Sequence, residues 1–205
     1  MPTHTPNDLA LVYFDEPKRA EPIRYILAYG KIAFKDVRIP LQDYAATKSS
    51  LDLPFGQVPT LSVNGTTYAQ SVAIARYVAK LAGLYPTDPL VALEADAIVD
   101  AALEVTLGVV FLKFSPDPVK ALDNLNNVVF PRILNGLEKR VVGPYFAGEN
   151  VTFADLFWLN FYIHKWLPNL DTLTASPDDF PKLKAIATTL QSCNELAEYF
   201  AKQTA

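Results

Sequence analysis

The chain has 205 residues, which fits one large domain or two small ones because a typical domain contains about 150 residues. The hydrophobic share is 50% and the charged share 20%, so the chain can bury a core and is not expected to be disordered. The formal net charge is −4 and no basic run occurs, which excludes the usual electrostatic footprint of a nucleic-acid-binding protein.

The sequence also lacks the patterns of membrane, secreted and metal proteins. The longest strongly apolar stretch, residues 105–112, is far shorter than the roughly 20 residues that span a bilayer. The amino-terminal residues have neither a basic start nor an apolar segment, which predicts a cytoplasmic protein. The single cysteine, Cys193, is expected to be an inert buried thiol, and His4 and His164 form no metal-ligand cluster. We therefore expect no metal, no membrane and no nucleic-acid partner.

The first part of the chain alternates between strand and helix patterns. Residues 9–13 form a short apolar run, and residues 33–39 alternate as in a second strand. Between them, apolar side chains recur at helical spacing from a start near residues 18–20 to a C-cap at Gly30. This order predicts a parallel βαβ unit.

A hairpin and another helix follow. Residues 44–50 are a short helical candidate, and residues 59–69 form two strand patterns around an Asn-Gly dipeptide at positions 64–65, which is typical of type I′ turns. Ser71 is the expected N-cap of a helix that Gly83 terminates. The predicted order is β-α-β-α-β-β-α.

The composition changes at a proline-bounded segment, and only helical patterns follow it. Thr152 and Asp155 have the spacing of a capping box at the start of one of these helices. Apolar residues repeat at helical spacing at Ile98, Ala102, Val105 and Val109, and again at Ile186, Leu190, Cys193 and Ala197. We expect an α+β domain over residues 1–83, a linker over 84–90 and an all-α domain over 91–205.

A few residues in the first domain could carry chemistry. Tyr13 ends the first strand, where open α/β sheets place ligands, and its hydroxyl can donate to an anion. Gln70 and Ser71 begin a helix whose free N–H groups could hold a carboxylate. A cis bond between Val58 and Pro59 would leave the Val58 backbone free to pair with a peptide. Taken singly, each is explained better by a structural role: a core tyrosine, a plain cap and a strand-initiating proline.

Together, these segments resemble the cytosolic glutathione transferases, above all the sigma class, which includes the glutathione-dependent prostaglandin D synthases. The resemblance covers essentially the whole chain and rests on residues 12–24, 55–59, 70–77 and 148–155. It implies a thioredoxin-like amino-terminal domain, an all-α carboxy-terminal domain and, usually, a homodimer. The activity it implies is the conjugation of the co-substrate glutathione to small hydrophobic electrophiles.

The resemblance also assigns roles to residues. It makes Tyr13 the catalytic hydroxyl that stabilises the glutathione thiolate, and it makes Glu104 a residue that acts from the neighbouring subunit. The implied glutathione-binding residues are Arg19, Tyr44, Lys48, Gln57, Val58, Pro59, Gln70, Ser71 and Glu104. The electrophile is expected in an apolar cleft between the domains, lined by Phe14, Glu16, Lys18, Leu107 and Phe111.

The chain departs from the pattern of these relatives at several positions. Tyr44 stands where they usually have tryptophan, Gln57 replaces a frequent lysine, and residues 16–18 replace a glycine-containing turn. Leu103 occupies the position of an acidic residue of the prostaglandin synthases, which weakens the prediction of that isomerase activity and its metal effect. The alternatives are a glutathione-dependent isomerase or peroxidase, and a non-catalytic relative that binds hydrophobic ligands.

Overall fold

The computed structural model describes residues 8–203, so His4 and the amino-terminal residues used to predict localisation lie outside the described range. The chain forms two compact units, which meet in sequence between Tyr85 and Pro86. No helix within residues 8–203 is long and apolar enough to cross a membrane.

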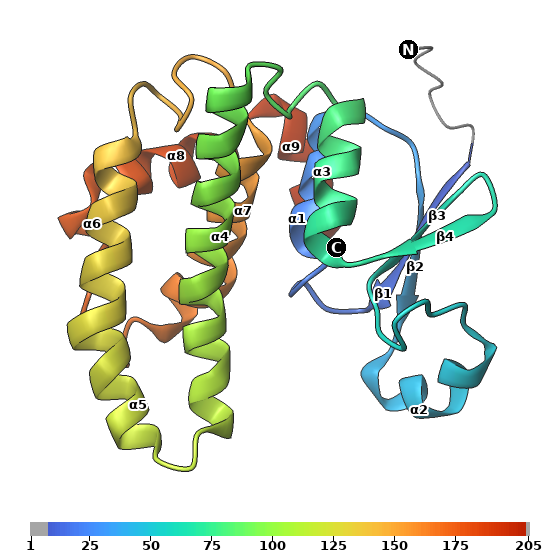
Figure 1. The fold of residues 1–205 in the computed structure, drawn as a ribbon, viewed down its shortest axis with the longest axis horizontal. Helices are drawn as coiled ribbons and strands as arrows, with labels where there is room; N and C mark the ends of the chain where they lie inside the picture. The colour runs from blue at the N-terminus through green and yellow to red at the C-terminus, as the bar shows by residue number, and fades with distance from the viewer. Residues whose placement is uncertain (1–7, 204–205) are drawn as a thin grey trace. The chain divides into compact units, whose positions relative to one another are not determined.

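The first unit contains a four-stranded mixed sheet with helices (Figure 1). Its strand order is β2-β1-β3-β4; β1 and β2 are parallel, whereas β3 is antiparallel to β1 and to β4. The elements are β1 (Leu9–Phe14), α1 (Glu21–Tyr29), β2 (Lys35–Ile39), α2 (Tyr44–Thr47), β3 (Thr60–Val63), β4 (Thr66–Ala69) and α3 (Ser71–Leu81). The predicted order of strands and helices is confirmed.

The local sequence explains the hairpin and the close packing of α1 on α3. Asn64 and Gly65 have φ angles of 49° and 85°, the positive values that a type I′ turn requires. A Cβ on Gly30, at the end of α1, would lie 2.6 Å from the Cβ of Ala82 at the end of α3. Glycine therefore lets these two helix ends approach each other (Figure 1).

One helix boundary in this unit differs from its prediction. Ser71 is the first residue of α3 and not its N-cap; the N-cap is Gln70, whose side chain makes no capping hydrogen bond. The reason is the backbone of Gln70, whose φ of 76° and ψ of 105° end the extended chain one residue earlier than expected. Gly83, with a φ of 71°, follows the end of α3 as predicted.

The second unit is helical, as predicted (Figure 1). Its α-helices are α4 (Pro89–Phe111), α5 (Pro118–Asn124), α6 (Phe130–Arg140), α7 (Phe153–Phe161), α8 (Pro181–Gln191) and α9 (Asn194–Gln203). Two π-helical turns, η4 (Leu125–Val129) and η5 (Tyr162–Trp166), continue α5 and α7. Pro89 and Leu90, which belong to the expected linker, form the start of α4, where Asp88 accepts hydrogen bonds from two backbone N–H groups.

The core of the second unit is built around α7. All nine residues of this helix are buried, and Trp158 and Trp166 are among the largest fully buried side chains. The predicted capping box is confirmed: the Asp155 carboxylate accepts hydrogen bonds from the backbone N–H of Thr152 at 2.7 Å and of Phe146 at 3.0 Å. The helix start is therefore fixed by a charged cap that is itself buried.

The apolar repeat near the carboxy-terminal end is not one continuous helix face, contrary to expectation. The helix α8 ends at Gln191, and Cys193 lies between α8 and α9, half-buried and not in the core. Ser192 is the C-cap of α8, and its hydroxyl and backbone N–H both bond to the carbonyl oxygens of Thr188 and Thr189 in the last turn. Burial raises the pKa of the Cys193 thiol, which disfavours its nucleophilic thiolate form.

Candidate active site

The pairing of the strands gathers three of the predicted residues at one edge of the sheet. Val12 of β1 pairs with Thr60 of β3, and Thr60 pairs with Ala69 of β4. The next residues along these strands are Tyr13, Pro59 and Gln70, so all three lie at the same edge. This edge is where β1 ends, β3 begins and β4 leads into α3.

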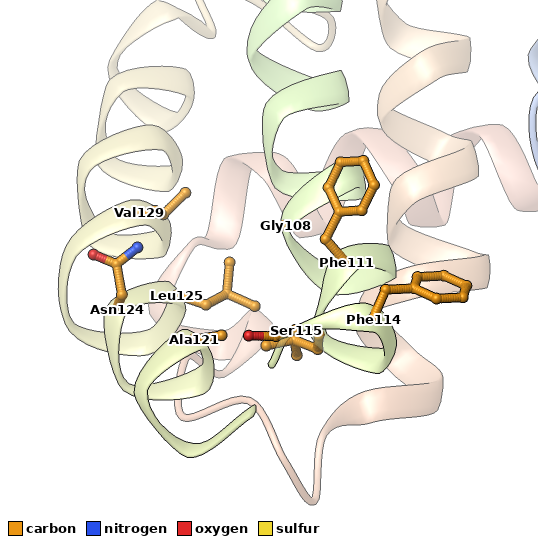
Figure 2. A pocket seen from close by; sticks show the side chains of 9 residues that line it. Gly108, Phe111, Phe114, Ser115, Ala121, Asn124, Leu125 and Val129 are labelled. Carbon is orange, nitrogen blue, oxygen red and sulfur yellow. The ribbon is translucent and has the colours of Figure 1, made fainter. Parts of the chain in front are cut away.

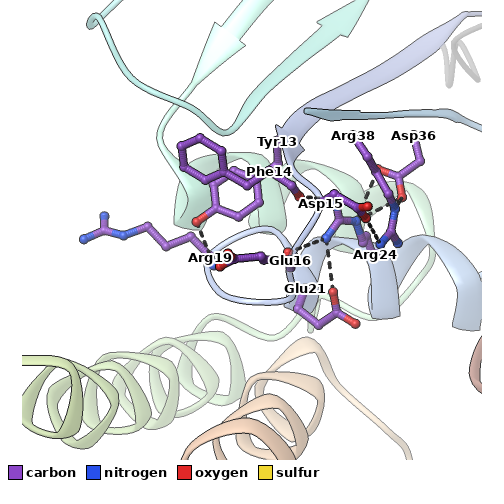
Figure 3. Close-up of polar contacts among 9 residues, drawn as sticks. All are labelled: Tyr13, Phe14, Asp15, Glu16, Arg19, Glu21, Arg24, Asp36 and Arg38. Carbon is purple, nitrogen blue, oxygen red and sulfur yellow. Dashed lines mark hydrogen bonds and ion pairs between the residues drawn. The ribbon is translucent and has the colours of Figure 1, made fainter. Parts of the chain in front are cut away.

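Tyr13 is buried, and its hydroxyl is held from one side. Only 3% of the residue is exposed, and its phenolic oxygen accepts a hydrogen bond from the backbone N–H of Arg19 at 3.3 Å (Figure 3). A phenol can accept hydrogen bonds and donate one, so the hydroxyl proton can be donated to another group.

The protonation of Tyr13 suits it as a donor. Burial raises the pKa of Tyr13 above its ordinary value of 10, while the Arg19 N–H and the charges of Lys18, Arg19 and Arg24 oppose that rise. The phenol is therefore neutral at physiological pH and can donate a hydrogen bond to an anion.

The loop after β1, residues 15–20, is held by a buried arginine. Arg24 of α1 is 0% exposed and donates to the carbonyl oxygens of Glu16 at 3.0 Å and Phe14 at 3.3 Å (Figure 3). Its charge is balanced by the carboxylates of Glu21 at 3.2 Å and Asp36 at 3.0 Å. Sequence reasoning did not single out Arg24; the one local signal is a charged residue among buried apolar neighbours in α1.

The Val58-Pro59 peptide bond is cis, in agreement with the resemblance. Pro59 is buried and Val58 half-buried, whereas Gln57 is exposed. Next to them, Gln70 has the positive φ described above, and Ser71 begins an 11-residue helix with free N–H groups at its first turn. A backbone segment that can pair with a peptide and a helix N-terminus that can hold a carboxylate thus lie at one edge.

The segment between β2 and β3 brings two further predicted residues together. The ring of Tyr44 contacts Phe14 edge-on, with the ring centroids 4.9 Å apart, and Phe14 lies 5.0 Å from the ring of Tyr13. The ammonium group of Lys48 lies 5.8 Å from the centroid of the Tyr44 ring. Tyr44 and Lys48 are therefore linked to Tyr13 through an aromatic contact. Arg19 is exposed, and Lys18 and Glu16 form an ion pair.

The remaining predicted residues lie in the second unit. Glu104 is exposed on α4 and pairs with Arg132 of the same chain. Phe111, at the end of α4, lines a cavity of about 330 Å³ that Leu107 does not line (Figure 2). The other lining residues are Gly108, Leu112, Phe114, Ser115, Ala121, Asn124, Leu125 and Val129. Among residues 8–203, no group of three or more metal-binding side chains is found.

Two family models cover most of the chain. One, described as "Glutathione S-transferase, N-terminal domain", matches residues 9–80, and another, described as "Glutathione S-transferase, C-terminal domain", matches residues 107–203. Their boundary agrees with the two-unit architecture.

Full-length relatives agree with these models. The chain is 32% identical over 202 residues to a "Glutathione S-transferase" of Anopheles gambiae, covering 96% of this chain and 97% of that protein. It is 33% identical over 205 residues to "Hematopoietic prostaglandin D synthase" of Mus musculus, covering 94% and 95% of the two chains.

The structure is similar to solved structures over almost its entire length. One is prostaglandin synthase D of Nilaparvata lugens, with a TM-score of 0.84, 26% identity and coverage of 96% of this chain and 98% of that one. Another is rat hPGDS complexed with a quinoline, with a TM-score of 0.78, 29% identity and coverage of 95% and 96%. Sequence, fold and site geometry thus lead to one conclusion: the chain belongs to the glutathione S-transferase family.

Proposed function

We propose that Tyr13 donates a hydrogen bond to the sulfur of bound glutathione and so stabilises the thiolate that attacks a small hydrophobic electrophile. The observation that carries this proposal is a buried, neutral phenol whose oxygen is held by a backbone N–H at the sheet edge shared with Pro59 and Gln70. The enzyme is a glutathione S-transferase, and the proposal concerns how its residues perform the conjugation.

The energy that the reaction requires is within the range of this geometry. A cysteine thiol has an unperturbed pKa of about 8.5, and lowering it by about two units requires roughly 2.7 kcal/mol of preferential stabilisation of the anion. A hydrogen bond to a charged group contributes about 1.5–3 kcal/mol. One phenolic donor in a largely buried position can therefore supply most of the stabilisation.

Glutathione itself would be held by groups of the first unit. The Val58 backbone, ahead of the cis Pro59, would pair with the cysteinyl residue, and Gln70 with Ser71 would bind the γ-glutamyl carboxylate at the start of α3. The unfavourable φ of 76° at Gln70 supports a functional role, because such strain is concentrated at binding sites. The other proposed contacts are Arg19, Tyr44, Lys48, Gln57 and, from a partner subunit, Glu104.

The electrophile is assigned to a largely apolar set of side chains. Phe14, next to the Tyr13 ring, is the central member of this set. The remaining members of the proposed set are Glu16, Lys18, Leu107 and Phe111.

The finer classification is part of the same proposal. Similarity to the Mus musculus prostaglandin D synthase and to "Glutathione S-transferase S1" of Drosophila melanogaster, which is 29% identical over 199 residues, supports a sigma-class enzyme. A homodimer, a cytoplasmic location, a detoxifying role and independence of a metal are proposed on the same basis.

The decisive experiment is the substitution Tyr13→Phe, assayed with a chlorodinitrobenzene-type acceptor. We expect kcat to fall about 100-fold, as it does when one donor to a developing anion is removed, while the affinity for glutathione stays nearly unchanged. An unchanged kcat contradicts the assignment. The matched control is Tyr68→Phe, which removes the hydroxyl of an exposed tyrosine of β4 that belongs to no proposed contact.

A spectroscopic titration checks the protonation state independently. Because burial raises the pKa of Tyr13, the difference in tyrosinate absorbance between the wild-type protein and Tyr13→Phe should have its midpoint above the ordinary tyrosine value of 10. A difference that develops near neutral pH contradicts the role of a neutral donor.

The names of some relatives favour a second candidate activity, a glutathione-dependent isomerisation. Mouse and rat relatives are named hematopoietic prostaglandin D synthase, so an isomerase acting on endoperoxides is the second candidate. Product analysis with endoperoxides, hydroperoxides and halogenated aromatic acceptors separates isomerase, peroxidase and conjugating activities. Retention on immobilised glutathione without turnover of any of these substrates would instead indicate a ligand-binding relative.

A further inference from the structure

The buried side chain of Arg24 binds the backbone that follows the proposed catalytic residue, Tyr13. Arg24 is 0% exposed, and its guanidinium donates to the carbonyl oxygens of Phe14 and Glu16, which directly follow or lie near Tyr13 in sequence. Its Nε donates to both carboxylate oxygens of Asp36, at 3.2 and 3.0 Å. The side chain thus connects the end of β1, the loop 15–20 and β2 (Figure 3).

A packing role alone does not require this residue. Burying a guanidinium costs several kcal/mol unless hydrogen bonds and countercharges offset the cost, and apolar residues of similar size often serve as well in a core. An apolar side chain, however, could not donate to the carbonyl oxygens of Phe14 and Glu16. The feature specific to arginine is its planar set of donors, which can reach two carbonyl groups and a carboxylate at once.

The loop that Arg24 holds has weak local determinants. Ala20, the N-cap of α1, provides no side-chain cap, and Lys18 has a φ of 68°, which is unfavourable for a residue other than glycine. The conformation of this loop therefore depends on contacts from outside it. The hydrogen bond from Arg24 to the Glu16 carbonyl oxygen is such a contact, and a second bond holds Phe14 at the end of β1.

The same loop also donates a hydrogen bond to the hydroxyl of Tyr13. Arg19, whose N–H donates to the phenolic oxygen at 3.3 Å, lies three residues after Glu16, whose carbonyl Arg24 holds. We infer that Arg24 is a positioning residue for thiolate stabilisation: it fixes the loop 15–20 so that the Arg19 N–H orients the Tyr13 hydroxyl towards the sulfur. This inference rests on the proposed role of Tyr13.

The test is a double-mutant cycle of Arg24→Lys and Tyr13→Phe in the full-length protein, with kcat and the KM for glutathione measured separately. Arg24→Lys keeps the charge but cannot reproduce the planar donor set. We expect kcat to fall about ten-fold, as for a small misplacement of a catalytic group, with the KM for glutathione nearly unchanged. Because Arg24 acts through Tyr13, the double variant should be no slower than Tyr13→Phe alone.

The control is Arg38→Gln. Arg38 belongs to the same charged cluster, but its contact with the loop is an ion pair to the exposed side chain of Asp15. Because such a pair contributes little, kcat should remain within about two-fold of the wild type. If Arg24→Lys does not fold, Asp36→Asn, an isosteric change at a partly exposed side chain that anchors Arg24, replaces it in the cycle with a smaller decrease in kcat.

The possible outcomes separate the inference from the function on which it rests. Effects of Arg24→Lys and Tyr13→Phe that multiply overturn the inference, as does an equal loss of kcat in Arg38→Gln. A loss confined to the KM for glutathione also overturns it. Tyr13→Phe with unchanged kcat overturns the proposed function, and the inference with it.

Discussion

In each unit, a charged side chain with no exposed surface holds the backbone where a loop enters a helix, and the two side chains are of opposite type, a base and an acid. In the first unit, Arg24 donates to the carbonyl oxygens of Phe14 and Glu16. In the second, Asp155 accepts from the backbone N–H groups of Phe146 and Thr152. Both charged side chains are 0% exposed. In both units, a buried side chain thus satisfies backbone hydrogen-bonding groups of an irregular segment next to the core: a basic side chain binds carbonyl oxygens, and an acidic one binds N–H groups.

The two solutions differ in what balances the charge. The partners of Asp155 are neutral N–H and hydroxyl groups, and burial raises the pKa of this carboxyl while these hydrogen bonds oppose the rise. Arg24 also has the carboxylates of Glu21 and Asp36. The helix dipole accounts for the difference: it stabilises an anion near a helix N-terminus and disfavours a cation there, so Arg24 needs carboxylates whereas Asp155 needs no cation.

The largest effect is expected from Arg24→Met. This change removes the Arg24 cation from the buried Glu21 carboxylate and from Asp36, so the free energy of unfolding should fall by about 3–5 kcal/mol in urea denaturation. Adding Glu21→Gln should recover part of the loss, because the second change removes the charge of one carboxylate that Arg24 balanced. A loss no larger than that of a surface substitution would show that the carboxylates do not depend on Arg24.

A smaller effect is expected from Asp155→Ala. The backbone N–H groups of Phe146 and Thr152 lose their acceptor, but no buried countercharge remains, so the free energy of unfolding should fall by about 2–3 kcal/mol. Thr152→Val, which removes only the hydroxyl bond to Asp155, is the matched control and should cost about 1 kcal/mol. If Asp155→Ala costs more than Arg24→Met, the proposed importance of countercharges is wrong.

The smallest effect is expected from Arg38→Gln. The side chain of Arg38 is 28% exposed, and its bonds to Asp36 and Asp15 lie at the surface of the same cluster. Such pairs contribute little, so the free energy of unfolding should change by less than about 1 kcal/mol. A loss comparable with that of Arg24→Met would mean that the cluster behaves as one unit and that burial does not set its energetics.

Of these two charged sites, one was predictable from the sequence and the other was not. The capping box is contained in four consecutive residues from Thr152 to Asp155, so local spacing predicted it. The Arg24 site joins the end of β1, the start of α1 and Asp36 of β2, and no local pattern shows that these segments meet. Periodicity likewise predicted the apolar face of α4, but it missed the break after α8, because Cys193 and Ala197 continue the apolar spacing beyond the point where that helix ends.

The candidate active site likewise combines features that the sequence predicted with features that it did not. The hairpin and the order of elements along the chain were readable from the sequence. The pairing of β1 with β3, which brings Tyr13 to the same edge as Pro59 and Gln70, was not contained in any local pattern. The positive φ of Gln70 was not readable, because glutamine rarely adopts it and no local pattern demands it. The roles of these residues came from the resemblance of several motifs taken together.

The close contact at Gly30 couples two parts of the first unit. The helix that carries Arg24 and the helix that begins at Ser71 touch at their far ends, where a methyl group on Gly30 would collide with Ala82. A bulkier residue at position 30 would wedge these ends apart and tilt both helices. Such a change would disturb both the loop before α1, which holds Tyr13, and the start of α3, where we propose that the γ-glutamyl carboxylate binds, although position 30 itself belongs to neither.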